Sequence, residues 1–316
     1  MIISFDIIIP VYNENITTVE QTIASIVNSL SERHQASIIV VNDGSDDSYN
    51  IDKLSNNQDI TYIKHEINRG YGAALKTGIL SGKSPYIAII DADGTYPPEE
   101  LPRLVDEIQF YDMVIGVRTG PVSQIPRLRR FPKKMLNLFA SYISGENIPD
   151  LNSGMRIFSR DLCYYLWGFF PQGFSFTSTI TMGAIMGGFR IKNIPINYFK
   201  RSGHSSIRPI KDTIHFFRLV ARLGLIFYPT KLFYPIAGIL MLSGFLKASL
   251  KDFWHMGTIG TTSQTLMLAG LEIFMIGLVA NLIVHNRSFR LQHPLQNNLS
   301  SNAKIRTDNT FQEKKG

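Results

Sequence analysis

The stretch YIAIIDADGTYPPEE, Tyr86–Glu100, decides the fold class of this chain. Its first five residues are apolar or aromatic and predict a buried strand. Two aspartates one residue apart, Asp91 and Asp93, follow the strand, and the chain then breaks at Gly94 and at the pair Pro97–Pro98. A buried strand that ends in two carboxylates indicates a site at the carboxyl edge of a sheet.

Strand-like and helix-like patterns alternate around this stretch through the first 120 residues. The predicted strands are Phe5–Tyr12, Ala36–Asp43, Ile60–His65, Tyr86–Asp91 and Asp112–Val117. The predicted helices are Thr17–Leu30, a helix from Gly70 to about Leu80, and Pro98–Phe110. In the first of these, Thr17 and Glu20 have the spacing of a capping box. The alternation predicts an α/β domain with a mostly parallel sheet and helices on both faces, followed by a short strand that bears Arg156.

Polar side chains gather where three of the predicted strands end. They are Asn13 and Glu14, Asn42 and Asp43, and Asp91 and Asp93. Several carboxylates at one sheet edge repel one another unless a counter-charge is present, and a divalent cation with a phosphate ligand is the simplest one. The alternative is that these are turn carboxylates that cap the next helix, which suits Asp43 better than it suits the whole set.

Other motifs narrow the function classes. The sequence has no G-x-x-x-x-G-K-[ST] and no G-x-G-x-x-G after the first strand, which argues against a P-loop enzyme and a dinucleotide cofactor. The glycine-rich stretch Asn68–Gly78 is a weak signal that also fits a helix packed closely on the sheet. The one cysteine, Cys163, excludes an intrachain disulfide and is expected to be a small buried residue.

Two stretches near the end of the sequence predict membrane spans. Leu225–Leu246 has Lys231 as its one charge, and Thr265–Val284 has Glu272 as its one charge. Two buried helices of a soluble domain are the alternative. The first residues lack the features of an export signal, so the front half of the chain is expected in the cytoplasm. A carboxylate within a span and the nearby small residues Gly270 and Gly277 favour a homo-oligomer formed through the spans.

Basic residues flank the predicted spans. Residues 190–231 hold nine basic side chains against one acid, and by the positive-inside rule both ends of the hairpin face the cytoplasm. A basic patch beside membrane spans favours anionic lipid over nucleic acid as a partner. Residues 209–228 predict an amphipathic helix at the membrane interface, or a packed helix with a solvated basic face. The expected division is therefore a catalytic domain 1–208, an interfacial helix 209–228, a hairpin 229–286 and a disordered tail 287–316.

With these features, the sequence resembles the inverting family 2 glycosyltransferases of GT-A fold. More specifically, it is similar to the polyprenyl-phosphate sugar synthases, such as the dolichyl-phosphate mannose and glucose synthases. The resemblance rests on IIPVYNE (Ile8–Glu14), VVNDGSDD (Val40–Asp47), NRGYGAALKTG (Asn68–Gly78), the DAD form of the D-x-D motif, NSGMRIF (Asn152–Phe158) and the terminal hairpin. It implies an integral membrane protein of a bacterial or archaeal plasma membrane.

The resemblance implies roles for residues of this chain. Pro10, Tyr12, Glu14 and Asp43 would line the pocket for the base and ribose of a nucleotide-sugar. Asp91 would lie near the ribose and diphosphate, and Asp93, with Asp91, would hold Mg²⁺ or Mn²⁺. The basic residues implied at the reacting phosphate and at the acceptor are Arg118, Arg130, Arg156, Arg201 and Arg208. Lys134, from the same basic run as Arg118 and Arg130, is a further candidate at the acceptor phosphate. The sequence departs from relatives at Gly94-Thr95, where Leu-Gln is common, and at Ser205-Ser206, where Ser-Lys is common.

The segment Phe174–Ile180 decides which acceptor the sequence favours. Family 2 enzymes with alcohol acceptors carry a carboxylate base in this region, and this segment has no acid. A phosphate monoester is already anionic, so it needs positioning cations but no base. A polyprenyl phosphate is therefore the expected acceptor, with UDP-glucose preferred to GDP-mannose as donor. Transfer to a neutral lipid such as diacylglycerol, or an inert nucleotide-sugar-binding scaffold, are the alternatives; a polysaccharide synthase is disfavoured because Q-x-x-R-W is missing.

Overall fold

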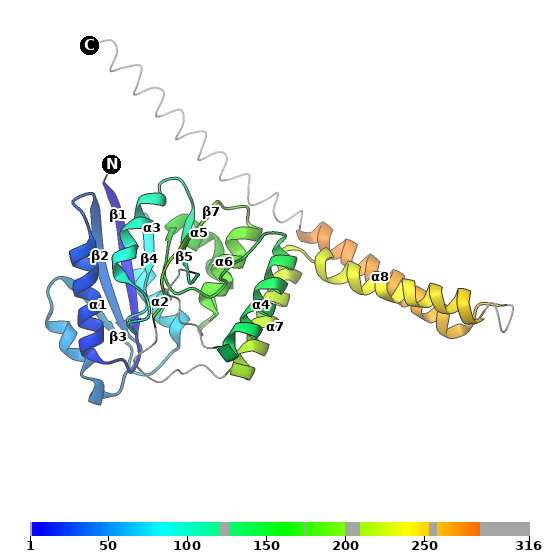
Figure 1. Ribbon diagram of the computed structural model, residues 1–316, viewed down its shortest axis with the longest axis horizontal. Helices are drawn as coiled ribbons and strands as arrows, with labels where there is room; N and C mark the ends of the chain where they lie inside the picture. The colour runs from blue at the N-terminus through cyan, green and yellow to red at the C-terminus, as the bar shows by residue number, and fades with distance from the viewer. Residues whose placement is uncertain (1, 120–126, 174, 200–208, 253–257, 285–316) are drawn as a thin grey trace, which may run out of the picture. The chain divides into compact units, whose positions relative to one another are not determined.

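The computed structural model describes residues 2–119, 127–173, 175–199, 209–252 and 258–284. By its internal contacts the chain divides into two units, Met1–Leu223 and Gly224–Gly316. The first unit contains one sheet with helices, and the second contains two long helices (Figure 1). The predicted tail 287–316 lies outside the described residues.

Seven strands of the described residues form one sheet in the order β3-β2-β1-β4-β6-β5-β7. All neighbouring pairs are parallel except those of β6, which runs antiparallel to both β4 and β5. The prediction of a mostly parallel sheet is confirmed. The strands are β1 (Ile3–Val11), β2 (His34–Asn42), β3 (Ile60–Lys64), β4 (Tyr86–Ile89), β5 (Met113–Val117), β6 (Arg156–Ser159) and β7 (Ile191–Pro195).

Helices cover both faces of this sheet (Figure 1). Those of the first unit are α1 (Ile16–Ser29), α2 (Tyr71–Ser81), α3 (Leu101–Glu107), α4 (Arg127–Ser144), α5 (Arg160–Leu166), α6 (Phe176–Met186) and the greater part of α7 (Pro209–Phe227). Short helices are η1 (Asp47–Tyr49), η2 (Ile51–Asn56), η3 (Pro98–Glu100) and η4 (Trp167–Phe169). The second unit holds α8 (Thr230–Lys247), the π-helical turn η5 (Ala248–Asp252) and the helix Thr261–Val284.

The start of α1 differs from the expected capping box. Asn15 is the N-cap residue, and its side chain accepts a hydrogen bond from the backbone N of Thr17 at 2.9 Å. Thr17 is therefore already inside the helix, and its pairing with Glu20 as a capping box is wrong. Asparagine is as good an N-cap as threonine because its side-chain oxygen reaches the same unpaired N–H groups.

The alternation of side chains along β1 builds the core. Phe5, Ile7 and Ile9 belong to one cluster with residues of α1 and α3, and all three are fully buried. Ile8, on the opposite side of the strand, faces α2, where a Cβ added to Gly78 would lie 2.6 Å from its Cγ2. The glycine-rich stretch therefore lets α2 approach the sheet, which is the packing role that the sequence left open.

The lone cysteine is buried, as expected. Cys163 lies on α5 with no exposed surface, and burial raises the pKa of its thiol to about 12. A thiol with so high a pKa stays protonated and unreactive at neutral pH. It is part of the packing of this unit.

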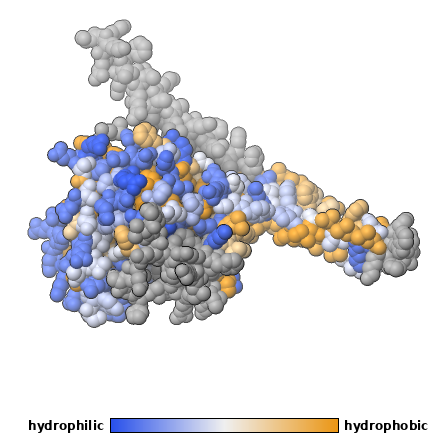
Figure 2. All heavy atoms as spheres, in the orientation of Figure 1, coloured by the Kyte–Doolittle hydropathy of each residue, from blue (hydrophilic) through white to orange (hydrophobic). Residues whose placement is uncertain are grey.

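The second unit carries two helices that are long and apolar enough to cross a membrane. They are Thr230–Leu250, with a mean hydropathy of 1.4, and Thr261–Val284, with a mean hydropathy of 2.2. Only 17% and 11% of their most apolar windows are buried, and Figure 2 shows apolar side chains exposed along them. Apolar surface this extensive disfavours the alternative of two buried helices of a soluble domain.

Glycines allow close contact between these two helices. A Cβ added to Gly270 would lie 2.5 Å from Cγ of Met241 and 3.0 Å from the carbonyl oxygen of Ala237. Gly277 is similarly close to Phe233, so both glycines pack inside the hairpin.

We expect Gly270→Ala to destabilise the hairpin by about 1–3 kcal/mol because the added methyl group overpacks the contact. Gly238→Ala is the matched control, since a Cβ at Gly238 would meet nothing within 4 Å and alanine is the better helix former. Thermal unfolding of the full chain in detergent measures both. A Gly270→Ala protein as stable as the control would contradict the close packing.

Candidate active site

Asp91 lies just beyond the carboxyl end of β4, and its carboxylate is held from two sides. The hydroxyl of Tyr71, the first residue of α2, donates to Oδ1 of Asp91 at 2.9 Å. On the other side, a Cβ added to Gly154 would lie 2.2 Å from Oδ2, so any side chain at this position would displace the carboxylate. Burial, together with the charge of Asp91, raises the pKa of Tyr71 well above its ordinary value. The phenol therefore remains a donor.

Asp93 is held by the turn that follows it. Oδ1 of Asp93 accepts hydrogen bonds from the backbone N of Thr95 at 3.1 Å and from the Thr95 hydroxyl. Thr95 is fully buried, and Gly94 between the two residues has φ of +73°, a conformation that favours glycine. The Gly94-Thr95 departure noted in the sequence therefore places a hydroxyl donor against Asp93.

The loops after β1 and β2 are tied to each other beside these aspartates. Backbone N of Asn13 donates to the Ser45 hydroxyl at 3.0 Å, and the Asn13 side chain exchanges hydrogen bonds with Asp46. Of the predicted nucleotide ligands, Tyr12 is exposed and Glu14 is half-buried in the same loop. Pro10 lies in β1 opposite Val41 of β2.

Asp43, another predicted nucleotide ligand, binds the protein through both carboxylate oxygens. Oδ1 contacts Nδ1 of His65 at 2.6 Å and accepts from the backbone N of Arg69, while Oδ2 accepts from the backbone N of Gly70 at 2.8 Å. The buried carboxylate thus fixes the loop that leads into α2. Its contact with a base stays a prediction.

Arg118 follows β5 and forms an ion pair with Asp150. Its Nε and Nη2 donate to the two carboxylate oxygens at 2.7 and 2.8 Å, and the guanidinium lies 5.1 Å from the ring centroid of Tyr198. Burial lowers the pKa of Arg118, but the adjacent Asp150 carboxylate outweighs this effect and the net shift is upward. Arg118 is therefore a permanent cation.

Arg156 is placed differently from its predicted role at a phosphate. Its side chain is fully buried, and its guanidinium donates to the carbonyl oxygens of Ser153 and Thr177 and to the Thr181 hydroxyl. Burial lowers its pKa to about 10, so it remains charged at neutral pH. These contacts join β6 to α6, and a role of Arg156 at a phosphate stays a prediction.

Of the remaining predicted cations, the structure describes the side chain of Lys134 alone. Lys134 is exposed on α4, and Arg130 belongs to the same helix, although its side chain lies outside the described part. Arg201 and Arg208 lie outside the described residues altogether. The structure therefore brings Asp91, Asp93 and Arg118 to one edge of the sheet and leaves the acceptor cations as predictions.

The start of α6 is the place where an alcohol acceptor would need a base. Ser175, Thr177, Ser178 and Thr179 are all buried there, and the carbonyl of Thr177 accepts from Arg156. Hydroxyl groups with ordinary pKa values are not general bases at neutral pH. The described residues of this turn thus supply no carboxylate.

Several residues with a part in the site were not predicted from the sequence. They are Tyr71, Thr95, Asp150 and His65. Each contacts a predicted residue. Tyr71, Asp150 and His65 are remote in sequence from the residue that they contact, and Thr95 was noted only as part of a departure from relatives. Two of them had a signal in the sequence: Tyr71 lies within the motif NRGYGAALKTG, and Asp150 lies two residues before NSGMRIF.

The donor groups fit a divalent ion that is shared with a diphosphate. Among the described residues no three His, Cys, Asp or Glu side chains lie close enough to hold a metal by themselves. Asp91 and Asp93 offer carboxylate oxygens, and Mg²⁺ at phosphate-transferring sites is commonly held by one or two carboxylates plus phosphate oxygens and water. Two carboxylates on one turn are therefore sufficient.

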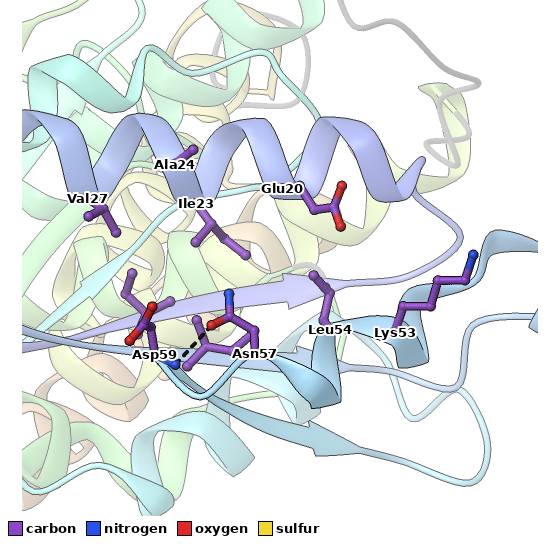
Figure 3. A pocket seen from close by; sticks show the side chains of 10 residues that line it. Glu20, Ile23, Ala24, Val27, Lys53, Leu54, Asn57 and Asp59 are labelled. Atoms are coloured by element: carbon purple, nitrogen blue, oxygen red, sulfur yellow. Dashed lines mark hydrogen bonds between the residues drawn. The ribbon is translucent and has the colours of Figure 1, made fainter.

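A surface hollow of about 270 Å³ is separate from this edge (Figure 3). It lies between α1, η2 and the beginning of β3, and Ile23, Leu54 and Asn57 are among its lining residues. None of the predicted site residues lines it. The acidic edge of the sheet is the better candidate site because carboxylates and cations converge there.

Comparison with known proteins decides the family. The model of glycosyl transferase family 2 matches residues 6–167, just over half of the chain. The chain belongs to glycosyl transferase family 2. A second model, the GtrB C-terminal hairpin, matches residues 228–285 and so covers both long helices of the second unit. The protein is thus a glycosyltransferase with a hairpin of the GtrB type.

Two relatives each match about three fifths of this chain. A dolichyl-phosphate hexose transferase of Haloferax volcanii is 29% identical over 208 residues, which are 64% of this chain and 86% of that protein. A polyprenol monophosphomannose synthase of Mycolicibacterium smegmatis is 31% identical over 209 residues, 62% of this chain and 77% of that protein.

A solved structure shows the same fold. Glucosyl-3-phosphoglycerate synthase of Mycobacterium tuberculosis, in complex with Mn²⁺, UDP-glucose and phosphoglyceric acid, has a TM-score of 0.55 at 17% identity. The match covers 70% of this chain and 79% of that one. This family 2 chain therefore has the GT-A fold that the sequence predicts.

Proposed function

We propose that this glycosyltransferase moves a sugar, with inversion, from a nucleotide-sugar to a polyprenyl phosphate at a membrane surface. The observation that carries the proposal is the start of α6, where buried hydroxyl groups stand in place of a carboxylate base. The names of the two relatives, a dolichyl-phosphate transferase and a polyprenol phosphomannose synthase, agree with this acceptor class.

The reaction needs no proton transfer if the acceptor is a phosphate. An oxygen of the anionic acceptor attacks the anomeric carbon, a new C–O bond forms, the bond from that carbon to the diphosphate breaks, and a nucleoside diphosphate leaves. Charge that develops on the leaving diphosphate is stabilised by preorganised cations, and Arg118 is such a cation at the sheet edge. Asp91 and Asp93 would hold Mg²⁺ or Mn²⁺, which supplies Lewis-acid stabilisation of the same diphosphate.

The roles of the remaining predicted residues are part of the proposal. Pro10, Tyr12 and Glu14 line the base and ribose, and Asp43 supports that pocket through the loop before α2. Arg130, Lys134, Arg201 and Arg208 bind the acceptor phosphate. UDP-glucose is the preferred donor and GDP-mannose the next, by family analogy.

The membrane is the proposed partner of the first unit as well as of the hairpin. On α4, the apolar side chains of Met135, Leu138 and Tyr142 are 44–63% exposed and share one helix face. Phe139 stacks on Phe217 of α7 at 5.5 Å, and Ile214 of α7 is also exposed. Exposed apolar rows next to cations such as Lys134 are typical of helices at a lipid interface.

We propose that the catalytic domain, 1–208, faces the cytoplasm of a bacterium or archaeon, with the interfacial helix 209–228 leading to the hairpin 229–286. We also propose that the protein forms a homo-oligomer through its spans, but Glu272 rather than the two glycines now supports this proposal. Gly270 and Gly277 pack inside the hairpin, whereas Glu272 is exposed on its surface. A carboxyl group in contact with lipid is costly, so a second copy is its proposed partner.

A transfer assay tests the proposed function. Purified full-length protein in detergent receives a polyprenyl phosphate and radiolabelled UDP-glucose, GDP-mannose or UDP-N-acetylglucosamine, with Mn²⁺ or Mg²⁺. We expect label in the organic phase with one donor, and removal of the metal by EDTA should reduce the label to background. Label on diacylglycerol but not on the phosphate would support the neutral-lipid alternative and overturn our proposal. Label on neither acceptor from any donor would support the inert scaffold.

A further inference from the structure

Tyr71 occupies an unusual position between two parts of the site. It is the first residue of α2, and its hydroxyl donates to Oδ1 of Asp91 at 2.9 Å. The residue before it, Gly70, donates its backbone N–H to Oδ2 of Asp43 at 2.8 Å. Two consecutive residues, Gly70 and Tyr71, thus contact Asp43 at the end of β2 and Asp91 at the end of β4.

The backbone at Tyr71 is held firmly enough to aim its side chain. Asp43 binds the backbone N of both Arg69 and Gly70, and His65 holds that carboxylate from the other side. From the opposite direction, the backbone N of Ala73 donates to the carbonyl oxygen of Gln172 at 2.9 Å. Three hydrogen bonds therefore hold the backbone at the beginning of α2, and a fourth holds the Asp43 carboxylate. Two side-chain torsions then determine where the tyrosine hydroxyl lies.

The carboxylate of Asp91 has limited freedom of its own. Gly154 lies against Oδ2 so closely that a Cβ there would be 2.2 Å away, and the Tyr71 hydroxyl fixes Oδ1. The backbone N of Gly154 in turn donates to the Tyr96 hydroxyl at 2.6 Å, which holds this segment in place. Tyr71 of α2 and Gly154 in the segment before β6 together fix the orientation of the Asp91 carboxylate.

We propose that Tyr71 is a positioning residue, which orients the Asp91 carboxylate for the metal–diphosphate end of the nucleotide-sugar. This inference rests on the proposed function. Through Gly70 and Asp43 it also links the base side of the pocket to the diphosphate side. Tyr71 has no direct contact with substrate in this assignment, so removing its hydroxyl weakens nucleotide binding without abolishing transfer.

The test compares two tyrosine variants of the full chain in detergent. Tyr71→Phe removes the hydroxyl but keeps the ring. Tyr62→Phe is the matched control, because it removes the hydrogen bond that Tyr62 of β3 donates to Asp52 of η2. Titration calorimetry with Mn²⁺–UDP and with Mn²⁺–GDP measures binding, and steady-state kinetics separates KM from kcat. We expect about tenfold weaker binding and a raised donor KM for Tyr71→Phe, the effect of losing one hydrogen bond to a charged group, and no change for Tyr62→Phe.

A double-mutant cycle separates positioning from general loss of structure. In an Asp91→Asn background, Tyr71→Phe should have less than a twofold further effect on binding, because the carboxylate that it orients is gone. Binding by Tyr71→Phe equal to wild type, or a full additional tenfold loss in the Asp91→Asn background, would overturn the inference and leave the proposed function standing. A wild-type protein that binds neither nucleotide with Mn²⁺ would overturn both.

Discussion

Asp93→Asn is expected to lower the rate of sugar transfer by about 1000-fold at saturating donor and acceptor. The amide has no negative charge, so the variant loses much of its affinity for the divalent ion and with it the stabilisation of the leaving diphosphate. The turn itself should survive, because the amide oxygen of asparagine accepts the same hydrogen bonds from Thr95 that Oδ1 of Asp93 accepts. The kcat of the purified variant with Mn²⁺ or Mg²⁺ is the measurement.

The control for this variant is Asp46→Asn, which changes an exposed aspartate in the neighbouring loop. The substitution removes the same negative charge as Asp93→Asn does, but the Asp46 side chain contacts Asn13 and is not proposed to bind the metal. We expect it to retain transfer within about threefold, as is usual for surface positions. A transfer rate of Asp93→Asn close to that of wild type, at low as well as high metal concentration, would contradict the metal role of Asp93.

Much of the sheet was predictable because its central strands have clear patterns. β1 and β2 each have nine residues with long buried runs, and the acidic residues after them stand where parallel strands end. β6 was predicted as a short strand that bears Arg156, whereas β7 was not predicted, since its five residues are only partly buried and lack a long apolar run. The insertion of β6 between β4 and β5 depends on pairing between distant segments, and no local pattern encodes it.

The candidate site was predictable where a short motif carries the functional side chains itself, as the D-x-D motif does. Asp91 and Asp93 stand at the end of β4 as the sequence predicts. The arginines were recognised as cations, but their partners are set by tertiary contacts. Arg118 meets Asp150, 32 residues away, and Arg156 turns into the interior toward Thr177 and Thr181. The position of an arginine along the sequence does not reveal whether its guanidinium binds a carboxylate, a carbonyl oxygen or a substrate.

The pair of Arg118 and Asp150 leads to the second large effect. The side chain of Asp150 is fully buried and that of Arg118 is 15% exposed. Asp150→Asn keeps the shape but removes the charge that compensates the guanidinium. Breaking a buried ion pair from one side costs about 3–5 kcal/mol. For a unit of this size, the melting temperature is then expected to fall by roughly 6–20 °C.

Glu100→Gln is the matched control, because Glu100 pairs with an Arg103 side chain that is 58% exposed. A pair in contact with solvent contributes about 0–1 kcal/mol, so its loss should move the melting temperature by less than about 3 °C. Thermal unfolding of the full-length proteins in detergent compares the two. If both variants melt together, the Arg118 guanidinium is compensated by something other than Asp150. If only Asp150→Asn is destabilised, and a nucleoside diphosphate with Mn²⁺ raises its melting temperature by more than that of wild type, the diphosphate contacts the guanidinium that Asp150 otherwise compensates.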